Sequence, residues 1–418
     1  MPKKARTILT IYLTAATLIA GWWLLAFNSA DKKNSPSQLS LSRSSPLPTQ
    51  PTPSLLKYIS PLERVTLHQA LAGDFSLMTK LISEWDVDAQ ILQSFGIASA
   101  KRISQENYLR VQLLNRLLNH SSPEELHALC NLFRAESVYD DNHLPFALQK
   151  PYARVLPQTH SSASILLAIA QPEQITAIPG GMRKQTHIFP LSITSKVSLD
   201  IESYSSERLY RSRPELAFVA QYSHPSTIEA LKNQGIELFN INEIDTLDQI
   251  NNALLRIGNI VNRPMEAELL TLFIDAAMQT IDNRFIASNF NAFNQEMAPR
   301  ILMLNYRSRY STPTSKTLAG QLMQRAGISL YAKDCSAWSL PLDQEQIVNI
   351  NPDCMIIAAA NQELLKPHVE EDPAFQNITA IRNKQLHMID DDVQQFPSQY
   401  IVLAYFDLFN ALFLLPDS

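Results

Sequence analysis

The chain has 418 residues, of which 45% are hydrophobic and 18% charged, enough for a buried core and more than one domain. Its formal net charge of -5 gives no reason to expect a nucleic-acid partner. The three cysteines, Cys130, Cys335 and Cys354, lack the CxxC spacing of a metal or redox site. Cys354 lies in an apolar run and is expected to be a buried thiol, with pairing to Cys335 left open.

The first 30 residues predict export across a membrane. Lys3, Lys4 and Arg6 precede an apolar run over residues 8–27, which is the order of an export signal. The run is about 20 residues long and can span a bilayer. Residues 1–30 are therefore either a cleaved signal peptide or an inner-membrane anchor, and the rest of the chain is expected outside the inner membrane.

Two regions without chemical motifs follow. Residues 31–56 are rich in Ser and Pro and predict an extended linker. Residues 57–150 predict an accessory helical region. Its apolar residues follow helical spacing over three segments, 65–83, 104–119 and 123–135.

Residues 151–262 predict an N-terminal α/β lobe. A strand at 153–156 leads through a polar turn to a helix at 163–170, with Ser161 or Ser162 as the expected N-cap. The other expected elements are strands at 174–178, 215–220 and 236–241 and a helix at 227–233. Alternating strands and helices predict a parallel sheet, whose ligands lie beyond the carboxyl ends of the strands. Five polar residues fall at that edge: Thr159, His160, Tyr222, Ser223 and His224.

Residues 263–297 predict a connecting helix, and residues 298–418 a C-terminal lobe. The connecting helix is expected from Met265 to about Phe285, behind Pro264 and an Asn262 cap, as a stiff rod about 30 Å long. The C-terminal lobe is expected to contain strands at 300–304, 353–360 and 386–389 and helices at 315–326 and 398–414.

One pattern occurs twice. Glu207 and Glu345 are each followed by six residues, a Pro, an acid and a continuous apolar run. Each copy predicts a short helix that the Pro ends, followed by a strand buried on both faces. The repetition favours two similar lobes.

From about residue 153 to 415 the chain resembles the class III periplasmic substrate-binding proteins of ABC importers, which bind cobalamin, ferric siderophores, haem and related chelates. The stretch 154–169 is similar to the family's R-I-V-S-L-S-P-S-A-T-E-I-L, and both Glu-x6-Pro-acid copies match its pattern. Residues 372–375 and 380–383 resemble its D-P-x-W and A-V-K-N-G endings. The departures from the family are His160, Ala163, Ser164, Phe375 and Lys384.

The resemblance implies an α/β fold of two Rossmann-like lobes with parallel sheets, joined by one long helix, with the N-terminal helical region as an extension. It also implies a partner, the permease and ATPase complex of an ABC importer. Glu207 and Glu345 stand where the family has its permease-docking acids, one in each lobe. Charge-assisted Glu–Arg bonds would fix the orientation of docking; the alternative role is an acid that stabilises a helix N-terminus.

The ligand site is expected between the lobes. The candidate ligand-binding residues are Thr159, His160, Tyr222, His224, Tyr306, Arg307, Arg309, Tyr310 and Trp338. Two Arg near two Tyr suit an anionic chelate, and His or Tyr would ligate haem iron. A ferric siderophore or haem is the first expectation and cobalamin the second, while a bare metal site stays open.

The expected function is a non-enzymatic periplasmic binding protein that delivers an iron chelate to a permease. No catalytic residue and no cofactor are expected, because no nucleophile–base pair, P-loop or GxGxxG motif is present. The alternatives are a cobalamin binder of the same family, or a membrane-anchored degenerate binder that acts as a sensor or scaffold.

Overall fold

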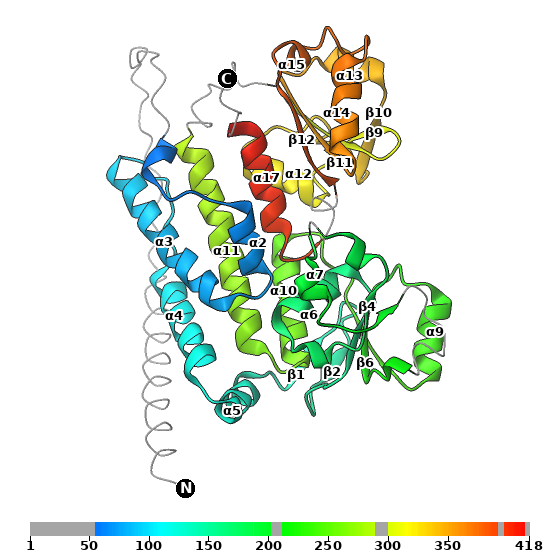
Figure 1. Cartoon of the computed structure of the whole chain (residues 1–418). Helices are drawn as coiled ribbons and strands as arrows, with labels where there is room; N and C mark the ends of the chain where they lie inside the picture. Colours follow the sequence, from blue (N-terminus) through cyan, green and yellow to red (C-terminus); the bar gives the residue numbers. More distant parts are fainter. Residues whose placement is uncertain (1–54, 187, 202–210, 289–299, 392–396, 414–418) are drawn as a thin grey trace, which may run out of the picture. The chain divides into compact units, whose positions relative to one another are not determined.

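The computed structural model describes residues 55–186, 188–201, 211–288, 300–391 and 397–413. Within these residues, four α-helices precede the first strand and form a helical extension (Figure 1), with a short 3-10 helix, η1, before them. Their bounds are η1 Leu55–Tyr58, α2 Arg64–Leu71, α3 Phe75–Ser94, α4 Gln105–His120 and α5 Pro123–Phe133.

The single helix expected at 65–83 is instead two helices, α2 and α3. Gly73 has φ +105° at the break between them, a conformation that favours glycine. Asp74 then caps α3, because its carboxylate accepts a hydrogen bond from the Leu77 backbone N–H. The α5 start is confirmed, with a capping box formed by Ser122 and Glu125.

The first sheet is parallel, with strand order β3-β6-β7. The strands are β3 Val155–Pro157, β6 Leu216–Val219 and β7 Glu237–Asn240, and a separate parallel pair joins β4 Ile178–Pro179 to β5 Asp200–Ile201. All four β6 residues are buried, as expected of a strand covered on both faces. The helices that follow these strands are α6 His160–Ile169, α7 Leu191–Thr194, α9 Pro225–Asn233 and α10 Leu247–Ile260.

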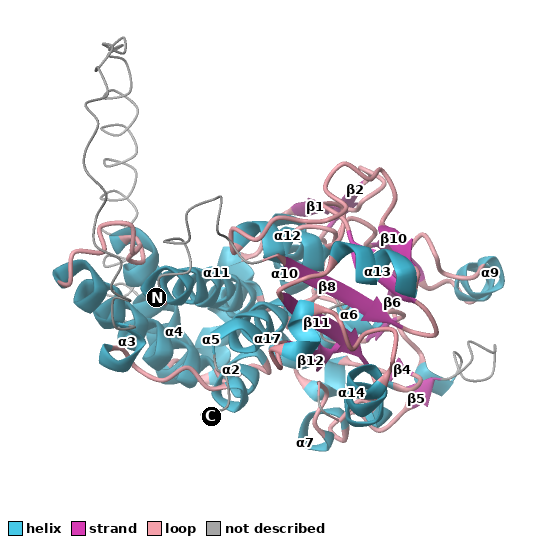
Figure 2. Cartoon of the chain, turned by 90° about the horizontal axis from the view of Figure 1, so that it is seen from above, coloured by secondary structure: helices cyan, strands magenta, loops and turns pink. Residues whose placement is uncertain are grey.

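The second sheet has strand order β10-β9-β8-β11-β12. Its strands are β8 Ile301–Tyr306, β9 Tyr310–Pro313, β10 Ser339–Leu342, β11 Cys354–Ala359 and β12 Leu386–Asp390. The parallel strands β8, β11 and β12 lie side by side (Figure 2), and β9 and β10 extend the sheet in antiparallel pairing. The strands expected from the sequence do not include β9 and β10.

The remaining helices include the expected connector. They are α11 Pro264–Ala287, α12 Leu318–Arg325, α13 Gln344–Ile350, α14 Gln362–Glu371, α15 Thr379–Arg382 and α17 Ile401–Phe413. Helix α11 packs against α3, α4, α10 and α17, which explains why most of its residues are buried. Two of these contacts are the tilted ring pair of Trp85 and Phe273 and the double hydrogen bond of Asn283 with the Lys101 backbone.

Two predicted helix caps are wrong. Thr159, not Ser161 or Ser162, caps α6, and its hydroxyl accepts from the Ser162 backbone N–H at 3.1 Å. Arg263, not Asn262, occupies the N-cap position of α11. Asn262 instead adopts φ 57° in the tight turn between α10 and α11.

Candidate functional site

A cavity of about 470 Å³ lies between the end of β7 and the second sheet. From the first lobe it is lined by Ile244 and Asp245, which follow β7. From the second it is lined by the β8–β9 turn, the start of α12 and the start of β10. It contains Arg307, Arg309 and Trp338, so it brings together three of the predicted ligand-binding residues.

Arg307 is held at the cavity by Asp391. The Nε of Arg307 donates a hydrogen bond to Oδ2 of Asp391 at 3.1 Å, and the two side chains form an ion pair. The Asp391 side chain is 5% exposed, whereas that of Arg307 is 65% exposed. The buried carboxylate therefore orients a guanidinium that solvent, or a ligand, can reach.

Arg309 and Trp338 complete the exposed part of this wall. Arg309 lies in the β8–β9 turn and is exposed, and it forms no salt bridge within the residues that the structure describes. Trp338 is 54% exposed. The Trp338 backbone is fixed, since the buried Thr314 hydroxyl donates to its carbonyl oxygen at 3.1 Å. The wall thus offers two cations and one aromatic ring.

The two predicted tyrosines pack behind this wall rather than along it. Tyr310 is 9% exposed, and its ring contacts those of Tyr306 and Phe375 at centroid distances of 4.9 and 5.9 Å. Burial, with smaller contributions from Tyr306 and Asp372, raises the pKa of Tyr310 to about 12. Tyr310 is therefore a neutral core residue of the second lobe.

Thr159 and His160 lie at the N-terminus of α6, at the carboxyl end of β3. The buried Thr159 hydroxyl is engaged by Ser162. It accepts a hydrogen bond from the Ser162 backbone N–H, and the two hydroxyl oxygens lie 2.9 Å apart. The His160 ring lies 6.3 Å from the Phe189 ring. Neither residue lines the cavity that contains Arg307.

Tyr222 and His224 follow β6 in one exposed turn. Tyr222 is 69% exposed, and its hydroxyl forms a hydrogen bond with the Thr159 side chain. His224 is the N-cap of α9, because its Nδ1 accepts from the Ser226 backbone N–H at 3.3 Å. Thr159, His160, Tyr222 and His224 therefore share a sheet edge, as predicted, but line a different surface from the Arg307 wall.

The docking pair is described only in part. Glu345 is exposed in the first turn of α13, two residues after the capping residue Asp343. Glu207 lies outside the described residues. The position of Glu345 suits both a docking contact and a favourable interaction with the helix N-terminus.

Asp391, which holds Arg307, and the lining residue Asp245 are not among the predicted site residues. Asp391 directly follows β12, so the rule that sites lie at the carboxyl ends of parallel strands could have found it. Asp245 comes five residues after the end of β7, too far along the chain for that rule to identify it. Burial, the main cause, and the nearby Glu243 raise the pKa of Asp245.

Metal and thiol chemistry find no support among the described residues. No group of three or more His, Cys, Asp or Glu is placed there to hold a metal ion. All three cysteines are free thiols, so Cys335 and Cys354 do not pair. Within the same residues, no helix is both long and apolar enough to cross a membrane.

Comparison with known proteins points to one family. Residues 159–393 match the family described as periplasmic binding protein. A high-affinity haem uptake system protein, IsdE, from Staphylococcus aureus is 20% identical over 155 residues, which are 36% of this chain and 51% of the relative. The chain therefore spans about half the length of the curated relatives it matches.

Solved structures agree in fold. The molybdate periplasmic binding protein MolA of Haemophilus influenzae has a TM-score of 0.54 and 15% identity, over 67% of this chain and 92% of MolA. A protein of an Fe3+-hydroxamate transport system from Saccharomonospora viridis has a TM-score of 0.51 and 12% identity, over 66% of this chain and 98% of that one. The family match covers more than half of the sequence and confirms the two-lobe α/β fold. The chain belongs to the periplasmic binding protein family.

Proposed function

We propose that this protein captures an anionic ferric siderophore between its lobes and delivers it to an ABC importer permease without catalysing a reaction. The observation that carries the proposal is the Arg307–Asp391 pair, which presents a fixed cation beside Arg309 in the cavity. Guanidinium groups bind the oxygen atoms of carboxylates and catecholates through charge-assisted hydrogen bonds. The exposed Trp338 ring offers a flat apolar contact for the rest of the ligand.

The side chains that line this cavity favour a chelate whose iron is already fully coordinated by the chelator. Haem iron in proteins is held by His, Cys, Met or Tyr. Among the residues that the structure describes, none of these types lines the Arg307 cavity, where the polar groups come from Arg, Asp, Asn, Ser and Thr. A siderophore needs no protein ligand to its iron, so the residues present suit it better.

Haem is the second candidate, because the curated relatives are named as haem uptake proteins. In that case the iron would be held outside the Arg307 cavity, at the edge that contains His160, Tyr222 and His224. His160 is the most favourably placed of the three, next to the buried Thr159 and facing Phe189. Cobalamin, and the role of an anchored sensor or scaffold, stay as further hypotheses.

Purification of the protein from its native host, followed by absorption spectroscopy and metal analysis, tests the ligand. We expect iron together with a broad visible charge-transfer band. A Soret band with iron would instead select haem, and cobalt with a corrin spectrum would select cobalamin. A colourless, metal-free protein that none of these compounds stabilises would overturn the chelate proposal.

Delivery is proposed to use Glu345 in the second lobe and Glu207 in the first. Glu345→Arg should abolish uptake of the chelate by host cells while leaving its affinity for the purified protein unchanged, because docking acids do not contact the ligand. Glu363→Arg is the matched control, since Glu363 is also a first-turn acid, on α14. Equal loss of uptake in both variants would contradict a specific role for Glu345.

A further inference from the structure

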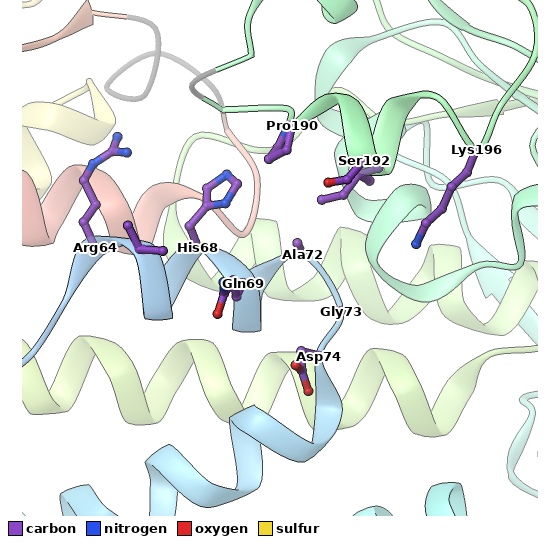
Figure 3. Close-up of a pocket in the computed structure, with 11 residues that line it drawn as sticks. Arg64, His68, Gln69, Ala72, Gly73, Asp74, Pro190, Ser192 and Lys196 are labelled. Atoms are coloured by element: carbon purple, nitrogen blue, oxygen red, sulfur yellow. The ribbon is translucent and has the colours of Figure 1, made fainter.

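A second cavity, of about 600 Å³, lies between α2 of the helical extension and the α7 segment of the first lobe (Figure 3). Its α2 wall, from Arg64 to Asp74, lies outside the residues that match the family, 159–393. The cavity therefore exists because this chain adds helices to the family fold. It does not overlap the cavity that contains Arg307.

Two groups on the α2 wall are held in place. Arg64 donates from Nε and Nη2 to the two carboxylate oxygens of Asp407 on α17, at 3.0 and 3.4 Å, which leaves its Nη1 outside this pair. His68 is fixed on two sides. Its Nε2 lies 2.6 Å from the Ile188 carbonyl oxygen, and its ring stacks on Tyr400 with centroids 5.2 Å apart. Because a carbonyl oxygen only accepts, this contact makes Nε2 the protonated nitrogen.

Lys196 supplies a cation from the opposite wall. It is exposed and forms no salt bridge within the described part of the chain. Figure 3 shows its side chain extending from the α7 side toward the α2–α3 turn that contains Ala72 and Gly73. Arg64, His68 and Lys196 therefore border one hollow from two elements that are more than 100 residues apart in the sequence.

The acid in the same lining is already engaged. Asp74 accepts a hydrogen bond from the Leu77 backbone N–H as the cap of α3, at 2.9 Å. Its charge is thus set against the positive end of a 20-residue helix. Asp407, the partner of Arg64, lines a different cavity. The formal charge of the lining is positive even when His68 is neutral.

We propose that this cavity binds a small oxyanion, a phosphate or carboxylate group, with Lys196 as its main cationic contact. Lysine and arginine donate charge-assisted hydrogen bonds to such oxygens. Pro190 and Ile193 in the same lining offer an apolar wall for a short carbon chain on the anion. Because one wall is α2 and the other is the α7 segment, an anion held by both would tie the helical extension more firmly to the first lobe.

Isothermal titration of the detergent-solubilised full chain with inorganic phosphate and with butyrate tests the site. Vesicles of phosphatidylcholine with phosphatidylglycerol form a parallel arm. We expect saturable binding that Lys196→Ala weakens about tenfold, the effect of losing one charged hydrogen bond. Lys196→Arg should retain the binding. Lys232→Ala, at an exposed lysine in the last turn of α9, should leave it unchanged.

The two arms of this experiment distinguish a soluble anion from a lipid headgroup. Binding of free phosphate or butyrate that depends on Lys196 supports a soluble ligand, whereas Lys196-dependent binding of vesicles alone supports the same chemistry on a lipid headgroup. Binding that Lys196→Ala and Lys232→Ala weaken equally, or no binding in any arm, would overturn the proposal.

Discussion

At the scale of single residues, the most informative feature is an arginine whose direction is set by a buried acid. An exposed arginine has many rotamers, and fixing it when a ligand binds costs conformational entropy. Asp391 removes part of that cost in advance by holding Nε of Arg307. A buried carboxylate is itself stable only when it is paired, so the two residues depend on each other.

Arg307→Ala should weaken binding of a ferric tris-catecholate at least tenfold, since it removes a charged contact from the cavity wall. Asp391→Asn should weaken it less, by about three- to tenfold, because the amide orients the guanidinium less firmly. Titration followed by Trp fluorescence measures both. Arg300→Ala is the matched control: Arg300 is as exposed as Arg307 and pairs with Asp353, but at the opposite end of β8. If Arg300→Ala weakened binding as much as Arg307→Ala, the effect would be one of overall charge.

The cysteines give a second prediction. Burial, the main cause, raises the pKa of both Cys130 and Cys354 to about 12. A thiol with a raised pKa stays protonated as the pH rises, and only the thiolate reacts quickly. At pH 8 the native protein should therefore show one fast thiol, Cys335, with a disulfide reagent, and three after unfolding. Fast reaction of Cys354 would contradict its burial, and two missing thiols after unfolding would indicate a Cys335–Cys354 bond.

At the scale of elements, the helical extension is attached to the first lobe through a close backbone contact. A Cβ at Gly73 would lie 2.3 Å from the Ala168 carbonyl oxygen of α6, a distance no side chain tolerates. Buried Gln399, just before α17, donates from Nε2 to the carbonyl oxygens of Leu71 and Ser164, at 3.3 and 2.8 Å. The end of α2, the first-lobe helix α6 and the start of α17 therefore meet at one point.

Gly73→Ala should lower the free energy of unfolding by about 2–4 kcal/mol, because it combines backbone strain with a steric clash. Thermal or urea unfolding measures this loss. Gly96→Ala is the control, since Gly96 also has a positive φ, +88°, but nothing lies within 4 Å of the added Cβ. Gly96→Ala should cost only the strain, about 1 kcal/mol. Equal losses would mean that the contact with α6 contributes nothing.

The elements also show what local sequence signals can and cannot predict. The helix at Pro123 and the buried strand at Leu216 were predicted because each depends on its own residues, through a capping box or a continuous apolar run. The break at Gly73 was missed, because apolar spacing continues across it and its cause is the distant α6. The antiparallel β9–β10 extension was missed for the same reason: strand pairing is a long-range contact.

At the scale of the whole molecule, the sequence indicates where the site lies better than it indicates which side chains line it. Arg307 and Arg309 were named from the sequence as candidate ligand-binding residues, and both line the cavity. Tyr310 was named with them, but it is buried against the Tyr306 and Phe375 rings. Which residues of one edge face the other lobe depends on how the lobes pack, and no local pattern in the sequence encodes that.

The helical extension also affects how far the two lobes are expected to move when a ligand binds. Helix α11 is about 36 Å long at 1.5 Å per residue, and α3 and α4 pack along it. A helix supported in this way resists bending, so ligand binding is expected to change the lobe arrangement little. Small-angle scattering with and without ligand should give nearly equal radii of gyration, and a clear decrease on binding would contradict a rigid connector.

The most direct test of the account is titration of the purified protein with a ferric tris-catecholate, for wild type and for Arg309→Ala. Arg309 is exposed in the β8–β9 turn, so its removal should leave the thermal stability unchanged. The account predicts saturable one-to-one quenching of Trp fluorescence in the wild type, at least tenfold weaker in the variant and reduced by salt. Equal affinity of both proteins, or tight binding of haem with a Soret shift that Arg309→Ala does not alter, would contradict a siderophore site in this cavity.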